Sequence, residues 1–255
     1  MQDRYQEEEK ERKSLHVAAQ LNNTAASLIE ARKFKAAVNL LNQTLSICEP
    51  YIESWRLHVA GSKVLSSSSD GLDFHLGKYM KRPEVLVGRT CDSISSRLSC
   101  CKRLKDVDDD VHEGAAGTYI YRHPIFVPCN SLAELLADKN QHDTANAAIN
   151  LSLTGVFNMA LAYNLFADAL QLQGHSAGIS HHALCKSSRL YELAYSILVR
   201  YNVACCSLFL TALVNNLGQN FKLMDKKENA NKVFRQFLPS LIHLTGDYRA
   251  RDMAI

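Results

Sequence analysis

The chain has 255 residues, of which 47% are hydrophobic and 22% charged, and its net charge is +3. A chain of this length can bury a substantial core in one or two domains. The small net charge, without runs of like charges, argues against a nucleic-acid partner. Only five prolines and eleven glycines are present, which disfavours an all-β chain with many tight turns. The composition therefore predicts an all-α protein, which we treat as a single domain over 1–255.

The sequence also bears on location. The stretch MQDRYQEEEKERKSL at 1–15 is charged and lacks the apolar centre of a secretory signal. The longest apolar runs, 151–167 and 203–214, are interrupted or short, whereas a membrane helix takes about 20 apolar residues. The eight cysteines contain no C-x-x-C pair and are expected to be reduced thiols. We expect a cytoplasmic or nuclear protein without a membrane partner.

The first predicted element, at 18–51, is a pair of amphipathic helices. Apolar or small residues recur there at spacings of 3, 4 and 7, as on one face of a helix. They are Leu21, Ala25, Leu28, Phe34, Ala37 and Leu41. The small residues Ala25 and Ala37 mark the expected close crossing of the two helices, and Pro50 is expected to end the pair.

Residues 52–150 form a predicted insertion. SSSSDG at 66–71 is typical of a flexible loop. GTYIYRHPIFVP at 117–128 is the only β-like stretch, because its tyrosine, isoleucine, phenylalanine and valine residues favour extended backbone. An independent β domain would need more strands. We therefore expect a small β-hairpin or an extended strap lying on the helices.

A second helix pair is predicted at 153–201. Its first helix carries apolar or small residues at Val156, Met159, Ala160 and Tyr163, and its second carries Ser187, Tyr191 and Ala194. The connection is about fifteen residues longer than in the first pair. We expect the surplus in QGHSAGISHH, where Gly174 and Gly178 would end one helix and open a loop.

A third helix pair is predicted at 211–244. Its apolar or small positions are Val214, Leu217, Gly218, Phe221, Ala230, Val233, Phe234 and Phe237. The polar stretch DKKEN separates the two helices. A side chain larger than methyl at Gly218 or Ala230 would push these helices apart, and the neighbouring aromatic rings are expected to fill the cleft beside them.

The three pairs share one register. The small residues Ala25, Ala160 and Gly218 are equivalent in it, and so are three asparagines, Asn23, Asn158 and Asn216. This pattern resembles the tetratricopeptide repeat, a 34-residue helix–turn–helix. The layout, with YRHPIFVP ahead of the second repeat, also resembles a group of uncharacterised tetratricopeptide-like proteins of diatoms, which implies no activity.

The tetratricopeptide resemblance implies a short solenoid of about three antiparallel helix pairs whose first helices line a concave groove. The alternative is an unrelated all-helical bundle with chance spacing. The small positions on which the register depends are Ala25, Ala37, Ala160, Ala194, Gly218 and Ala230.

No metal or catalytic site is predicted. DVDDDVHEG places aspartates at positions 1, 3 and 5 of a calcium loop, but Val111 and Gly117 occupy the sixth and twelfth positions, which need glycine and glutamate. HSAGISHHALC gathers His175, His181, His182 and Cys185 without a second cysteine pair. Phosphate-loop, G-x-S-x-G and H-E-x-x-H motifs are missing. We expect no cofactor, no metal and no enzymatic activity.

The resemblance implies an interaction module that binds a peptide or a partner helix of another protein in the groove. Helical spacing predicts the groove residues as Asn22, Phe157, Leu161, Asn164, Asn215, Gln219 and Lys222. They form no cationic clamp of the kind that holds a chaperone tail. One alternative is a small-molecule-binding or catalytic domain in which the 52–150 insertion closes the groove. Another is that the 117–128 strap simply covers Phe157 and Leu161.

Overall fold

The computed structural model describes residues 2–61, 121–129, 141–174, 177–200 and 207–235. Its helices are α1 (Gln2–Glu30), α2 (Phe34–Gly61), α8 (Gln141–Leu172), α9 (Ala177–Arg200) and α10 (Ser207–Leu223). A further helical stretch occupies 227–235. Within these ranges the backbone forms no β-strand. The predicted all-α class is confirmed, and a β-hairpin is not.

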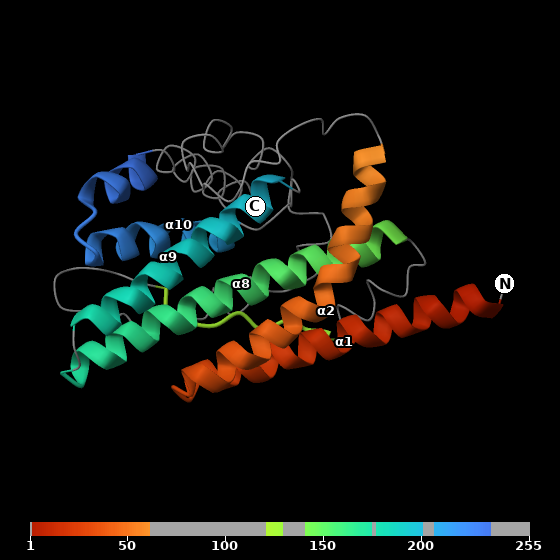
Figure 1. Cartoon of the computed structure of the whole chain (residues 1–255), viewed down its shortest axis with the longest axis horizontal. Coiled ribbons are helices and arrows are strands. Elements are labelled where there is room, and N and C mark those ends of the chain that lie inside the picture. Colours follow the sequence, from red (N-terminus) through yellow and green to blue (C-terminus); the bar gives the residue numbers. More distant parts are fainter. Residues whose placement is uncertain (1, 62–120, 130–140, 175–176, 201–206, 236–255) are drawn as a thin grey trace, which may run out of the picture.

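Successive helices run back and forth across the molecule (Figure 1). α1 packs against α2, α8 packs against both α2 and α9, and α10 packs against α9. None of the helices in the described part of the chain is both long and apolar enough to cross a membrane.

The first and last helix pairs are joined by the same type of turn. Arg32 after α1 and Asp225 after α10 both have a φ of 57°. One residue later, the N–H of Lys33 donates to the carbonyl of Leu28 and the N–H of Lys226 donates to the carbonyl of Phe221, each at 2.8 Å. A left-handed residue with this hydrogen bond is a Schellman-type helix end. The two turns stand at equivalent positions of the predicted register, 193 residues apart.

The predicted long loop between α8 and α9 is wrong. α8 continues to Leu172 and α9 begins at Ala177, so four residues, 173–176, separate the two helices. Gly174, with a φ of 70°, ends α8 as predicted, but Gly178 lies inside α9. The surplus residues lengthen both helices instead. They do so because Ser180, Ala183 and Leu184 continue the buried face of α9.

The boundaries predicted for the insertion are also wrong. α2 runs through Pro50 to Gly61, and α8 begins at Gln141. The segment between these helices is therefore 62–140, narrower than the predicted 52–150. A proline inside a helix removes one main-chain hydrogen bond and bends the axis, which need not end the helix. In Figure 1 the C-terminal part of α2 turns away from α1.

The small residues of the register lie in the interior. All five of its alanines are fully buried: Ala25, Ala37, Ala160, Ala194 and Ala230. At Gly218 an added Cβ would lie 2.7 Å from Cε1 and 2.8 Å from Cε2 of Phe234. These distances are shorter than van der Waals contact, so the ring of Phe234 packs against Gly218 in the space that a methyl group would take.

Cys48 provides a test of how tightly α2 packs in the core. Its side chain is fully buried, and burial raises the pKa of its thiol from an ordinary 9.0 to about 11. The thiolate is the reactive form, and a pKa two units higher lowers its population about 100-fold at pH 8.5. We expect iodoacetamide to label Cys48 at least ~100-fold more slowly in the folded chain than in denaturant, as measured by peptide mass spectrometry. Equal rates would contradict the packing of α2.

Candidate functional site

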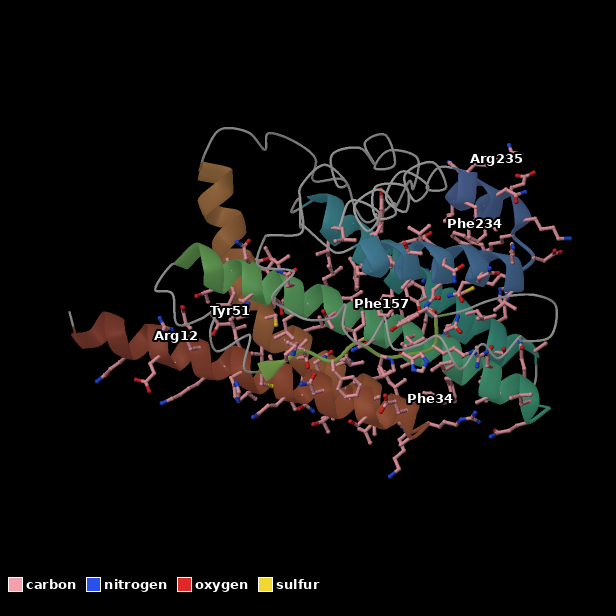
Figure 2. All side chains as sticks on the ribbon, turned by 180° about the vertical axis from the view of Figure 1, so that it is seen from behind. Arg12, Phe34, Tyr51, Phe157, Phe234 and Arg235 are labelled. Carbon is pink, nitrogen blue, oxygen red and sulfur yellow. The ribbon has the colours of Figure 1, made fainter. Side chains whose placement is uncertain are left out.

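Residues 121–128, which we call the strap, form an extended segment that crosses the helices. Figures 1 and 2, which view the chain from opposite sides, show it running along α8 between α1 and α10. Tyr121 and Ile125 belong to the core that α8, α9 and α10 share, and Val127 belongs to the core between α1, α2 and α8. The strap is therefore anchored in both cores by its apolar side chains.

Three asparagines bind the main chain of the strap, one each from α1, α8 and α10. Each side-chain oxygen accepts the N–H of one strap residue, and the amide nitrogen of the same asparagine donates to the carbonyl of that residue. The pairs are Asn23 with Val127, Asn158 with Ile125, and Asn216 with Tyr121. The donor–acceptor distances lie between 2.7 and 2.9 Å, which is the normal range for such bonds.

The chemistry of these pairs resembles that of a β-ladder. A side-chain amide carries a donor and an acceptor, as a peptide group does. It can therefore satisfy the N–H and C=O of one extended residue, as a neighbouring antiparallel strand would. Leaving such buried groups unpaired costs about 1–3 kcal/mol each. The three asparagines thus hold an extended backbone without making use of its side chains.

A second set of polar groups orients two of these asparagines. Asn22 donates to the carbonyl of Ile125 at 3.1 Å and accepts from the amide nitrogen of Asn158 at 3.0 Å. Asn216 donates to the hydroxyl oxygen of Tyr191 at 3.0 Å. Burial raises the pKa of Tyr191, although the bond from Asn216 acts in the opposite direction. The amides are therefore fixed in the orientation that binds the strap.

The strap also packs an aromatic ring against the core. The ring of Tyr121 lies 6.3 Å from that of Phe157. Phe157, which Figure 2 labels on α8, in turn packs against Tyr191 at 5.6 Å and Phe209 at 5.2 Å. These separations fit attractive aromatic pairs. The Tyr121 ring thus contacts Phe157 of an aromatic cluster, which we call the aromatic socket and whose members come from α8, α9 and α10.

The next strap residue forms an ion pair. Arg122 Nη2 lies 2.7 Å from Asp168 Oδ2, and the side chains are 45% and 21% exposed. Burial raises the pKa of the Asp168 carboxyl, and the charge of Arg122 lowers it by less than burial raises it. Since Arg122 is nearly half exposed, solvent screening limits what this pair adds to stability. Its significance is that a partly buried carboxylate meets a cation from the strap.

The predicted groove residues differ in their contacts and burial. Asn22 hydrogen-bonds the strap and Phe157 contacts Tyr121, while Leu161 is fully buried in the same core. The predicted covering of Phe157 by the strap is therefore observed. Asn164 instead donates to Asn220 on α10. The remaining three are half-buried, buried and exposed, respectively: Asn215, Gln219 and Lys222.

Sequence reasoning left the main binding residues out of the predicted groove. Asn23, Asn158 and Asn216 are equivalent positions of the predicted register, but the sequence assigns them no role. Their recurrence at one register position was the available signal. Asp168 carried no signal, because a single acidic residue on a helix is ordinarily a solvated one.

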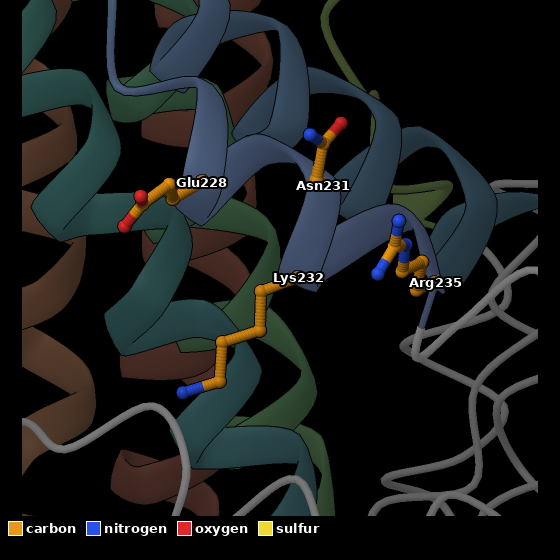
Figure 3. A pocket seen from close by; sticks show the side chains of 4 residues that line it. All are labelled: Glu228, Asn231, Lys232 and Arg235. Atoms are coloured by element: carbon orange, nitrogen blue, oxygen red, sulfur yellow. The ribbon is translucent and has the colours of Figure 1, made fainter.

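Two other recesses lie away from the strap. One is formed on the 227–235 helix by Glu228, Asn231, Lys232 and Arg235, whose side chains spread apart in Figure 3. The other lies along α1 and is lined by Gln6, Glu9, Lys10, Lys13, Ser14, Val17 and Ile47. Neither brings side chains together on one point, so neither is a candidate site.

The possible metal ligands are not gathered either. His181 and His182 are exposed on α9, and Cys185 is near the sulfur of Met224 at 3.6 Å. His175 and the acidic run at 106–113 lie outside the described residues. In the part of the chain that the structure describes, no three residues of the types His, Cys, Asp or Glu are grouped to hold a metal ion.

Comparison with known proteins adds no assignment, since no family model, no curated protein and no solved structure matches the chain.

Proposed function

We propose that the chain is a tetratricopeptide-like interaction module whose groove binds an extended peptide of another protein. One observation carries the proposal. Asparagines at the same register position of three helices each hold both main-chain groups of one extended residue. Main-chain recognition of this kind gives affinity for an extended peptide whatever its sequence, as an exposed sheet edge does.

The repeat architecture is supported by the turns. Arg32 and Asp225 share φ, hydrogen bonding and register position. Chance helical spacing in an unrelated bundle would not be expected to reproduce a left-handed residue at the same place in two pairs. The pairs would then stack as a short solenoid, with α1, α8 and α10 presenting equivalent asparagines to one groove.

The bonding favours an extended peptide over a partner helix. In a helix, main-chain N–H and C=O groups are already paired with each other. An extended backbone instead leaves them free for side-chain amides. In the structure the strap occupies this groove, so an incoming peptide would have to replace it.

A small-molecule or catalytic function ranks second. The strap, which is part of the predicted insertion, packs against α1, α8 and α10, and this position supports the alternative. However, the polar groups that the strap brings to the three asparagines are main-chain amides that these asparagines already satisfy. Nothing about them requires an additional ligand.

A synthetic peptide tests the proposal. A fluorescein-labelled peptide with the sequence YIYRHPIFVP, corresponding to 119–128, is titrated by fluorescence polarisation against the parent and against a Tyr121→Ser/Val127→Ser variant, whose own strap lacks two buried anchors. We expect at least ~10-fold tighter binding to the variant, since competition from the strap is weaker; tenfold corresponds to about 1.4 kcal/mol.

Two controls accompany the titration. Adding Asn158→Leu should abolish binding, whereas adding Asn42→Leu at an exposed position of α2 should leave it unchanged. Circular dichroism confirms that each variant is helical. A peptide that binds equally well with and without Asn158 would contradict the proposed groove.

A further inference from the structure

The strap offers the groove a defined pattern of side chains as well as a backbone. The main-chain anchors at Tyr121, Ile125 and Val127 point buried side chains into the protein, with exposures of 6%, 4% and 5%. Between the first two anchors, Arg122 meets Asp168. The side-chain pattern of the strap is therefore an aromatic residue followed directly by a cation, with aliphatic residues four and six positions after the aromatic one.

Asp168 makes the second position selective. Its side chain is only 21% exposed, so a segment without a cation there would leave a partly desolvated carboxylate unpaired, and an acidic residue would add repulsion. Unfavourable pairing of this kind is how interfaces reject wrong partners. The guanidinium of arginine suits a carboxylate better than other cations do, because its planar fork can donate two parallel hydrogen bonds.

The aromatic socket makes the first position selective. Tyr121 lies against Phe157, which is itself held by Tyr191 and Phe209. A small side chain in this place would leave buried aromatic surface without a partner, and such vacancies cost stability. Both requirements fall on neighbouring residues, next to the backbone anchor from Asn216.

We propose that the groove selects extended segments in which an aromatic residue is followed directly by arginine or lysine, and that the strap is the resident copy of this motif. A segment of another protein with the same pattern displaces the strap. This inference rests on the proposed function, because it names the class of peptide that the same groove takes. Charge complementarity at Asp168 favours a basic segment over an acidic or neutral one.

A charge-reversal experiment tests the selection. In the Tyr121→Ser/Val127→Ser background, two labelled peptides are compared: the strap sequence and the same sequence with glutamate in place of its arginine. We expect the arginine peptide to bind at least ~10-fold more tightly, a difference of about 1.4 kcal/mol. Asp168→Arg should reverse this preference, and raising the salt concentration should reduce it.

A matched control uses Asp225, which is 85% exposed and lies in the turn after α10. Asp225→Arg changes the net charge of the chain by the same amount as Asp168→Arg and should leave the preference for the arginine peptide unchanged. Reversal by both variants would mean that overall charge decides, which would overturn the assignment to Asp168.

The failures are distinguishable. If both peptides bind equally and Asp168→Arg changes neither, the selection is wrong while the peptide-binding function stands. If neither peptide binds, the proposed function itself fails. Light scattering tests a third occupant. If the Tyr121→Ser/Val127→Ser variant forms a dimer with the parent chain, whose strap then occupies the variant's groove, the occupant is a second copy of this chain. The assignment to another protein is then overturned.

A measurement on the unmodified chain avoids dependence on the background variant. Excess arginine peptide should accelerate hydrogen exchange at the amides of Tyr121, Ile125 and Val127 at least ~3-fold, because a displaced strap loses its three asparagine partners. The glutamate peptide should leave exchange unchanged. Acceleration by both peptides, or by neither, would overturn the selection.

Discussion

Replacing Asn158 with leucine is expected to lower the free energy of unfolding by about 2–4 kcal/mol, although leucine is apolar and similar in size. Asn158 makes three buried hydrogen bonds, with the N–H and the carbonyl of Ile125 and with the side chain of Asn22. The substitution leaves the N–H of Ile125 and the oxygen of Asn22 without these partners. Each unsatisfied buried group costs about 1–3 kcal/mol.

Urea denaturation followed by circular dichroism measures this loss, and hydrogen exchange at Ile125 locates it. Asn42→Leu serves as the matched control, because Asn42 is exposed on α2 and exposed substitutions usually change stability by less than about 0.5 kcal/mol. Asn158→Asp should also destabilise, since a carboxylate accepts from Ile125 but cannot donate to its carbonyl. Equal stability of the Asn158 and Asn42 variants would show that the pairing with the strap contributes nothing.

The helices could be predicted because their signal is local. Apolar residues at spacings of 3, 4 and 7 report the buried face of a helix without reference to the rest of the chain. Even so, ends were misplaced where two rules competed. Pro50 predicts the end of a helix, but a helix tolerates proline with a bend, as α2 does. Gly178 predicts a loop, but it lies inside α9.

The binding residues could not be predicted in the same way, because their partner is distant in sequence. Asn216 and Tyr121 are separated by 95 residues, and Asn23 and Val127 by 104. No local pattern tells which polar side chain meets a backbone that far away. The recurrence of asparagine at one register position was visible, but it gained a meaning only when the extended segment was found beside all three.

The asparagines that bind the strap directly follow predicted groove residues in the chain. The neighbouring pairs are Asn22 and Asn23, Phe157 and Asn158, and Asn215 and Asn216. One residue is about 100° on a helix, so Phe157 is fully buried in the core while Asn158 reaches the main chain of the strap. Asn22 is an exception, because it and its neighbour Asn23 both hydrogen-bond the strap.

The position of the strap has a consequence for stability. Tyr121 and Ile125 pack with α8, α9 and α10, whereas Val127 packs with α1, α2 and α8. One short segment thus contributes to two core clusters, so its release would expose apolar surface in both. A displacing peptide must cover that surface, which favours one that carries aliphatic residues at the positions of Ile125 and Val127.

The packing of the last helix pair leads to the second large effect. Gly218→Leu is expected to destabilise the chain by about 1–3 kcal/mol through overpacking. Even the first side-chain carbon would meet the ring of Phe234 below van der Waals distance. For a chain of this size, 1 kcal/mol lowers the melting temperature by about 2–4 °C, so the shift is measurable by thermal unfolding.

Gly155 of α8 offers the matched comparison. A Cβ there would meet Leu45 Cδ2 at 3.5 Å, an ordinary contact. Gly155→Ala should therefore be neutral or raise stability by up to about 1 kcal/mol, since alanine favours a helix interior over glycine. Gly218→Ala should be less stable than Gly155→Ala, and adding Phe234→Ala to Gly218→Leu should restore part of the loss, because it removes the ring that the new side chain meets. A Gly218→Leu chain that melts at the parent temperature would contradict both the close crossing and the register built on it.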